Sequence, residues 1–216
     1  MSKNIIFVAL LLLISLSRGK AQAVLRDPGD AEFNKQAPAV FKVLLETTKG
    51  NITLEVRRDW SPNGVDRFYN LVRNGYYDNT PFFRVRSGTW AQFGIAADPK
   101  VAQAWRNKAI PDDPRIESNT RGMVTYAFKD ANGRTTQIFI NLRDNRMPLD
   151  TQGFVPIAKV IKGMEVADAL YAQYGESAGG GIRAGKQDSL FAGSNNYLKR
   201  NFPLLDYIKK ASIIKD

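Results

Sequence analysis

The sequence predicts a mainly β fold, a closed eight-stranded antiparallel barrel capped by two α-helices. Seven or eight short runs rich in β-branched and aromatic residues follow one another from residue 41 onward, and turn-forming residues separate them. The two principal stretches with helical spacing lie far apart in the chain. A closed barrel leaves no unpaired sheet edge, and a helix at each open end would cover both mouths. The length of 216 residues is sufficient for one such domain with its own core.

The first two β-rich runs, 43–47 and 52–56, flank Thr48-Lys49-Gly50-Asn51 and predict an opening hairpin. A Ser87-Gly88 turn and the run Asp130-Ala131-Asn132-Gly133 each join a further pair of strands. The later predicted strands cover residues 81–85, 90–95, 123–128, 137–141, 155–160 and 207–214.

Two principal helices and one short helix are predicted between these strands. Ser61 is a candidate N-cap with Pro62 in the first turn, and Asn74-Gly75 ends this helix. Asp98-Pro99 predicts the start of a short helix through Trp105. The second principal helix follows Gly163 and places four residues on one face: Val166, Ala167, Leu170 and Tyr174.

Residues 1–23 have the features of a secretory signal peptide. Lys3 provides a positive start, the run from Ile5 to Leu16 is apolar apart from one serine, and Ala21-Gln22-Ala23 matches an A-x-A cleavage site. A membrane anchor is the alternative, but twelve helical residues span only about 18 Å of a hydrocarbon core about 30 Å thick. We therefore expect cleavage after Ala23, no stable membrane insertion afterwards, and export to a periplasm or the extracellular space.

The mature chain divides into a polar N-terminal arm, residues 24–40, and a barrel domain, residues 41–216, expected to be a monomer. The domain carries a long loop or insert around residues 175–203. Within it, the run from Gly180 to Gln187 nearly matches a nucleotide-binding P-loop. Gln187 lacks the hydroxyl that would hold Mg²⁺, so a flexible surface loop is the favoured interpretation.

The composition excludes several kinds of chemistry. The chain contains no cysteine and no histidine, so it has no disulfide, thiol nucleophile, Ser-His-Asp triad or HExxH metal site. We expect no metal and no cofactor. The net charge of +10 suggests nucleic-acid binding, but acidic residues are interspersed with the basic ones and no stacking motif accompanies them. A solvated basic surface is the favoured interpretation, with no nucleic-acid partner.

The segment from Phe82 to Gly94 is the most informative in the chain. Arg84 lies between Phe83 and Val85 in a predicted strand. On spacing alone, an exposed arginine or a surface ion pair is favoured, because alternate strand residues point outward.

The segment nevertheless resembles the signature of the cyclophilin family of peptidyl-prolyl isomerases, approximately F-H-R-[VI]-[IV]-x-G-F-x-x-Q-G-G. The matching residues are Phe82, Arg84, Val85, Gly88, Gln92 and Gly94.

The resemblance extends over about residues 41–174 and the last strand. Further similar blocks follow in the order of the family at residues 48–55, 61–77, 121–127, 136–140, 149–160 and 163–166. The fold that this resemblance implies is an eight-stranded antiparallel barrel with two capping helices, which agrees with the pattern of strands and helices.

Several positions depart from the family. Its histidine before the arginine is Phe83, and the pocket phenylalanine after the glycine is Thr89. An asparagine of the family is Phe128, a second histidine is replaced by Phe154, and the tryptophan of drug-sensitive members is Pro148.

By position, the resemblance implies Arg84 as the catalytic residue. The substrate-binding residues that it implies are Phe82, Gln92, Ala127, Gln137, Phe139, Leu149 and Phe154. Phe139 and Leu149 would form the floor of a proline pocket, and Gln92 would orient either the substrate or Arg84. The implied function is cis–trans isomerisation of proline-containing polypeptides by an exported, bacterial-like member of the family. The alternative is a non-catalytic peptide-binding or chaperone module on the same barrel, suggested by the altered rim.

Overall fold

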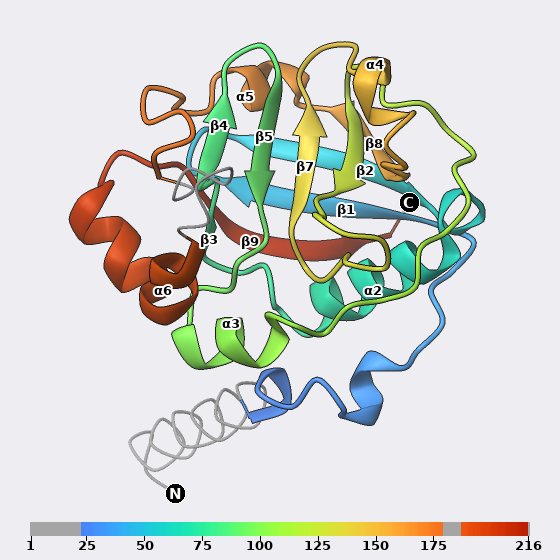
Figure 1. Ribbon diagram of the computed structural model, residues 1–216, viewed down its shortest axis with the longest axis horizontal. Helices are drawn as coiled ribbons and strands as arrows, with labels where there is room; N and C mark the ends of the chain where they lie inside the picture. The colour runs from blue at the N-terminus through green and yellow to red at the C-terminus, as the bar shows by residue number, and fades with distance from the viewer. Residues whose placement is uncertain (1–22, 179–186, 216) are drawn as a thin grey trace, which may run out of the picture.

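Nine strands form one antiparallel sheet that curls around a common core, and the predicted fold class is confirmed (Figure 1). The strands are β1 (Val40–Thr47), β2 (Asn51–Arg57), β3 (Thr80–Pro81), β4 (Arg84–Arg86), β5 (Trp90–Phe93), β6 (Met123–Tyr126), β7 (Ile138–Asn141), β8 (Pro156–Lys162) and β9 (Tyr207–Ile214). Their order across the sheet is β3-β9-β1-β2-β8-β6-β7-β5-β4. The end strands β3 and β4 are consecutive in the chain, separated only by Phe82 and Phe83. If β3 and β4 are counted as one interrupted strand, the sheet has the predicted eight strands. Their connection also brings the two ends of the sheet together.

The computed structural model describes residues 23–178 and 187–215. Nearly all of the expected signal peptide, residues 1–22, and most of the P-loop-like run, residues 180–186, therefore lie outside the described residues. Within the described ranges, no helix is both long enough and apolar enough to cross a membrane.

Alternating burial along β1 and β2 fills the interior of the sheet. Val43, Leu45, Ile52 and Leu54 are fully buried, while the residues between them are partly exposed. This period of two places one side chain of each pair in the core and the next toward solvent. By contrast, β6 and β7 are buried on both faces. On their outer face the Thr125 hydroxyl donates to Asn119 and the Phe139 ring packs against Phe154.

The first principal helix and the short helix are confirmed. Helix α2 (Pro62–Arg73) begins with proline in its first turn after Ser61, and helix α3 (Pro99–Trp105) follows Asp98, whose side chain accepts from the amide of Lys100. The 3-10 turns η1 (Ala31–Phe33) and η2 (Arg58–Trp60) and the single-turn helix α4 (Arg146–Leu149) complete this part of the chain.

The second principal helix is shorter than predicted. Helix α5 (Met164–Asp168) ends before Leu170 and Tyr174, although the helical spacing predicts both on its apolar face. Leu170 is nevertheless buried, and the Tyr174 ring packs edge-on against Phe202 at 5.2 Å. These side chains are apolar because the chain after α5 packs against the segment before β9, and not because they belong to one helix.

The expected loop around residues 175–203 contains a helix that the sequence pattern did not indicate. Helix α6 (Gln187–Asn201) lies beside α3 and buries Leu190, Phe191 and Leu198 (Figure 1). An ion pair between Arg106 and Asp188 joins the two helices. The kink at Ser194, where φ is 41°, divides the apolar residues between two helical segments, so no single helical period was visible.

A buried ion pair attaches the long connection between α3 and β6 to the start of α2. Arg134 and Asp113 are almost fully buried, and the Arg134 Nη2 donates to Asp113 Oδ2 at 3.0 Å. The same carboxylate accepts from the Ser61 hydroxyl and from the amides of Asn63 and Gly64. Asp113 therefore caps a helix that is distant in sequence, at the positive end of its dipole.

Burial by itself would raise the pKa of Asp113. Hydrogen bonds from Ser61, Gly64 and Asn63, together with the charge of Arg134, outweigh burial and hold this pKa below its ordinary value. A carboxyl group with a lowered pKa in the folded state stabilises that state above its unfolded pKa, which is about 3.9, and loses this contribution as the pH falls through the folded pKa.

We therefore expect Asp113→Asn to lower the free energy of unfolding at pH 7 by about 3 kcal/mol, because Arg134 loses its buried carboxylate and keeps the more exposed Asp112, at 3.1 Å. The difference between variant and wild type should shrink below about pH 4, where the carboxylate contribution is lost. Urea unfolding at pH 7 and pH 3 measures both quantities. Asp130→Asn, in the exposed turn before β7, is the matched control and should change stability little. An equal loss for Asp113→Asn at both pH values would contradict this account.

Candidate active site

A row of four side chains crosses the sheet on the face opposite the core. Arg84 in β4 pairs with Gln92 in β5, Gln92 with Phe139 in β7, and Phe139 with Thr125 in β6. Directly opposed residues in antiparallel strands share a face, so the ladder places all four on the same side. Ladder register thus brings together three residues that were predicted for the site and are far apart in the sequence.

The guanidinium of Arg84 is held by three neighbours. Its Nη1 donates to Gln92 Oε1 at 3.1 Å, and its Nη2 donates to Glu176 Oε1 at 2.7 Å. The cation also lies 5.0 Å from the centre of the Trp90 ring, within the range of a cation–π interaction. Only 14% of the Arg84 side chain is exposed. The exposed arginine favoured by spacing alone is therefore wrong. Arg84 does form an ion pair, with Glu176, but its side chain is mostly buried.

Three glutamines continue from Arg84 along one side of the site. Gln92 Nε2 donates to Gln137 Oε1 at 3.0 Å. Gln137 and Gln187 are joined by amide–amide hydrogen bonds of 3.3 and 3.4 Å. Gln187 is the first residue of α6, so the C-terminal helix also contributes to this side of the site.

Aromatic rings form the apolar side of the site. Phe139 packs edge-on against Trp90 at 6.4 Å and against Phe154 at 5.9 Å. Phe154 in turn lies 4.3 Å from the Phe128 ring, in a tilted arrangement. Leu149, also predicted for the floor, is joined to Phe154 because its carbonyl accepts from the Phe154 amide at 3.1 Å.

Of the two remaining predicted residues, Ala127 lies beside the site and Phe82 does not. Ala127 lies beside the site, where its amide donates to the Gln137 carbonyl at 2.9 Å. Phe82, by contrast, is fully buried and packs edge-on against Phe93 at 5.1 Å. Phe93 follows Gln92 in β5 and points to the opposite face. The assignment of Phe82 to substrate binding is therefore wrong: the break between β3 and β4 places its ring in the core.

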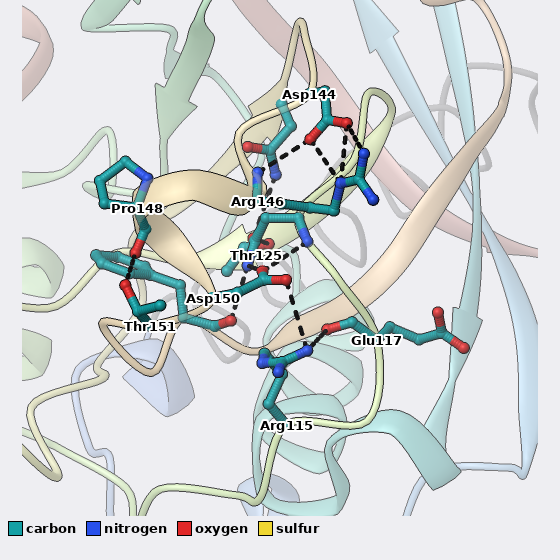
Figure 2. Close-up of polar contacts among 11 residues, drawn as sticks. Arg115, Glu117, Thr125, Asp144, Arg146, Pro148, Asp150 and Thr151 are labelled. Atoms are coloured by element: carbon teal, nitrogen blue, oxygen red, sulfur yellow. Dashed lines mark hydrogen bonds and ion pairs between the residues drawn. The ribbon is translucent and has the colours of Figure 1, made fainter.

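A polar network behind Thr125 supports the far rim of the site (Figure 2). Asn119 donates to Asp150 Oδ1 through both its amide, at 2.9 Å, and its side chain, at 2.8 Å. Its own side-chain oxygen accepts from the Thr125 hydroxyl at 2.8 Å. Arg115 forms an ion pair with Asp150 at 3.5 Å. The network thereby ties the segment after α4, which follows Leu149, to the sheet.

Burial tends to raise the pKa of Asp150, but hydrogen bonds from Asn119 and Ser118, with the charge of Arg115, lower it below its ordinary value. Asp150 therefore stays ionised at neutral pH and remains an acceptor for Asn119. It supports the rim and does not face Arg84.

Four residues that contact this row or belong to it were not predicted for the site: Trp90, Thr125, Glu176 and Gln187. Trp90 lies two residues before Gln92, so the period of two along β5 could have identified it. Glu176 and Gln187 had no such signal, because 92 residues separate Arg84 from Glu176 and only tertiary packing brings them together.

Comparisons with known proteins identify the family of this chain. Residues 42–181 match the family model described as cyclophilin type peptidyl-prolyl cis-trans isomerase/CLD. The chain is 33% identical over 141 residues to peptidyl-prolyl cis-trans isomerase A of Dickeya dadantii, covering 63% of this chain and 74% of the relative. It is 32% identical over 136 residues to peptidyl-prolyl cis-trans isomerase B of Escherichia coli, covering 59% and 82%.

The fold is also similar to that of a solved structure, a cyclophilin type peptidyl-prolyl cis-trans isomerase from Cryptosporidium parvum. The TM-score is 0.58 at 19% sequence identity, and the match covers 82% of this chain and 99% of that one. The arginine row, the curled antiparallel sheet and these matches lead to one conclusion: the chain belongs to the cyclophilin-type peptidyl-prolyl cis-trans isomerase family.

Proposed function

We propose that this protein accelerates cis–trans isomerisation of Xaa-Pro bonds in polypeptides, with Arg84 as the catalytic residue. The observation that carries the proposal is the position of Arg84, whose guanidinium stands at one end of a row that continues into an aromatic wall. A proline ring needs such an apolar wall, and the amide beside it needs a donor. Both lie on one face of the β4-β5-β7 ladder.

The reaction breaks no covalent bond of the chain. Its barrier, about 18–20 kcal/mol, is the loss of amide resonance as the bond twists. In the twisted state the proline nitrogen becomes pyramidal and can accept a hydrogen bond, which the planar amide nitrogen cannot. A guanidinium stays charged at every physiological pH and presents its donors in a fixed plane, so it stabilises the twisted state more than the planar one.

The other residues of the site hold substrate and cation in place. Gln92 fixes one edge of the Arg84 guanidinium, and Trp90 supports its face. Phe139, Phe154 and Leu149 provide the apolar surface for the proline ring. The step requires neither a proton shuttle nor a metal, which is consistent with a chain that contains no histidine or cysteine.

A non-catalytic peptide-binding module is the second candidate, and two observations favour it. Phe128 packs on Phe154 where the family has an asparagine, so one polar group of the rim is missing. Glu176 also occupies a donor of Arg84 in the structure. Binding of proline peptides without turnover would support this second function.

We further propose that the protein is exported after cleavage behind Ala23 and acts there as a monomer on proline-containing polypeptides. Contacts of the residues that follow Ala23 support this proposal. Val24 and Leu25 pack against the core, the Trp105 indole N–H donates to the Leu25 carbonyl at 2.8 Å, and Arg26 pairs with Asp98 at 2.9 Å. A cut after Ala23 would leave all of these contacts in the mature protein.

Arg84→Ala should lower kcat/KM for a proline peptide by about 10²–10³-fold, by analogy with removing one preorganised donor from an oxyanion hole. Arg84→Lys should restore little, because an ammonium group lacks the planar pair of donors. The rate of cis-to-trans conversion, followed by isomer-specific proteolysis of a short peptide, measures the effect. Circular dichroism and urea unfolding check that the variants fold.

Arg86→Ala is the matched control for Arg84→Ala, because it removes the same charge from an exposed position on the same strand. Arg86 also lies 5.5 Å from the centre of the Trp90 ring, so this control isolates the hydrogen bonds of Arg84 from its cation–π contact. It should keep most of the activity. A folded Arg84→Ala protein with wild-type turnover would refute the catalytic assignment, and equal losses in both variants would indicate a general electrostatic effect.

The export proposal predicts that the mature protein begins at Val24. Intact-mass measurement of protein recovered from the exported fraction tests it, and a mass that includes Met1 would contradict it.

A further inference from the structure

Glu176 reaches the active site from a part of the chain outside the β4-β5-β7-β6 ladder. It lies in the turns that follow α5, and its carboxylate accepts from Arg84 Nη2 at 2.7 Å. The side chain is 35% exposed, whereas Arg84 is 14% exposed. The acid therefore lies at the open side of the site, between the guanidinium and solvent.

Arg84 does not depend on Glu176 for its position. Gln92, directly opposite in the ladder, binds Nη1, and the Trp90 ring supports the face of the cation. Glu176 instead occupies the donor on the other edge, Nη2, which a peptide carbonyl would otherwise use. Because Glu176 already accepts from this donor, a substrate carbonyl must displace the carboxylate before it can bind Nη2.

The backbone on both sides of Glu176 is attached to the body of the protein. Before it, the Tyr171 amide donates to Asp206 Oδ2 at 2.8 Å, and the Tyr174 ring packs against Phe202. Two residues after it, Ala178 is fully buried. With these contacts kept, rotation of its own side chain is enough to take the Glu176 carboxylate off Arg84 while it stays beside the bound peptide.

We propose that Glu176 is a specificity-determining residue that selects proline substrates carrying a positive charge next to the proline. The inference rests on the proposed isomerase function of the same site. In the structure Glu176 pairs with Arg84. When a substrate carbonyl takes its place on the guanidinium, the released carboxylate attracts a lysine or arginine of the peptide and repels an aspartate or glutamate.

Three proline peptides that differ only in a lysine, a glutamine or a glutamate beside the proline test this proposal. Wild type should show kcat/KM about two- to fivefold higher for the lysine peptide than for the glutamine peptide, and lower by a similar factor for the glutamate peptide, the range that exposed ion pairs give. The preference should disappear in about 1 M salt, where the screening length is about 3 Å.

Glu176→Gln should abolish the charge preference and should lower KM for the neutral peptide severalfold with little change in kcat, because the internal competitor is weakened. Glu176→Asp should keep the order of the three peptides. Glu165→Gln removes the same charge from the exposed side of α5 and should leave the wild-type order unchanged.

The outcomes separate this inference from the proposed function. If wild type turns over all three peptides equally, or if Glu176→Gln keeps the preference, the role of Glu176 is refuted while isomerase activity stands. If wild type turns over none of them, the isomerase proposal fails. In that case calorimetric Kd values for the same peptides and variants decide whether Glu176 sets charge selectivity in binding. Equal Kd values of wild type for the three peptides would refute the role of Glu176.

Discussion

The junction of β3 and β4 is the constraint on which the rest of the structure depends. These strands lie at opposite ends of the sheet order, yet two phenylalanines are the only residues between them. Phe82 and Phe83 are both fully buried, and the Phe82 amide donates to the Asp206 carbonyl at 2.9 Å. The junction therefore anchors one strand on β9 and directs the next toward β5. Arg84 is the first residue after it, so the same feature that brings the ends of the sheet together also places the catalytic candidate.

Two arginine–carboxylate pairs of this molecule, Arg134–Asp113 and Arg84–Glu176, differ in burial and in the contacts that support them. The Arg134–Asp113 pair is buried on both sides, and its remaining polar atoms bind a helix start and a serine. Such a pair stabilises the fold only while both partners are present. The Arg84–Glu176 pair is more exposed, and its cation is also held by Gln92 and Trp90. Because Gln92 and Trp90 also contact Arg84, we expect the guanidinium to keep its position when a ligand replaces Glu176.

The site combines residues of the sheet with residues from the C-terminal part of the chain. The ladder of β4, β5, β7 and β6 supplies Arg84, Gln92, Phe139 and Thr125, and lies within the part of the chain that matches the family model. Gln187 comes from α6, beyond the matched residues, and Glu176 from the last turns within them. The ladder supplies the proposed catalytic cation and its apolar wall, and Glu176 and Gln187 reach the same side of the site from two later segments of the chain.

Local sequence determined the strands and the first helix. Alternation of apolar residues placed β1 and β2, and proline and serine marked the start of α2. These features depend on neighbours in the chain or on a register that alternation specifies. Gln92, Phe139 and Leu149 were implied as companions of Arg84 by the resemblance to the family and not by spacing. Tertiary structure alone decided three others: Phe82 lies in the core, α5 stops at Asp168, and α6 forms within an expected loop. The pairing of Glu176 with Arg84 belongs with these, because a contact between residues 92 positions apart depends on how separate segments pack and leaves no periodic signal in the sequence.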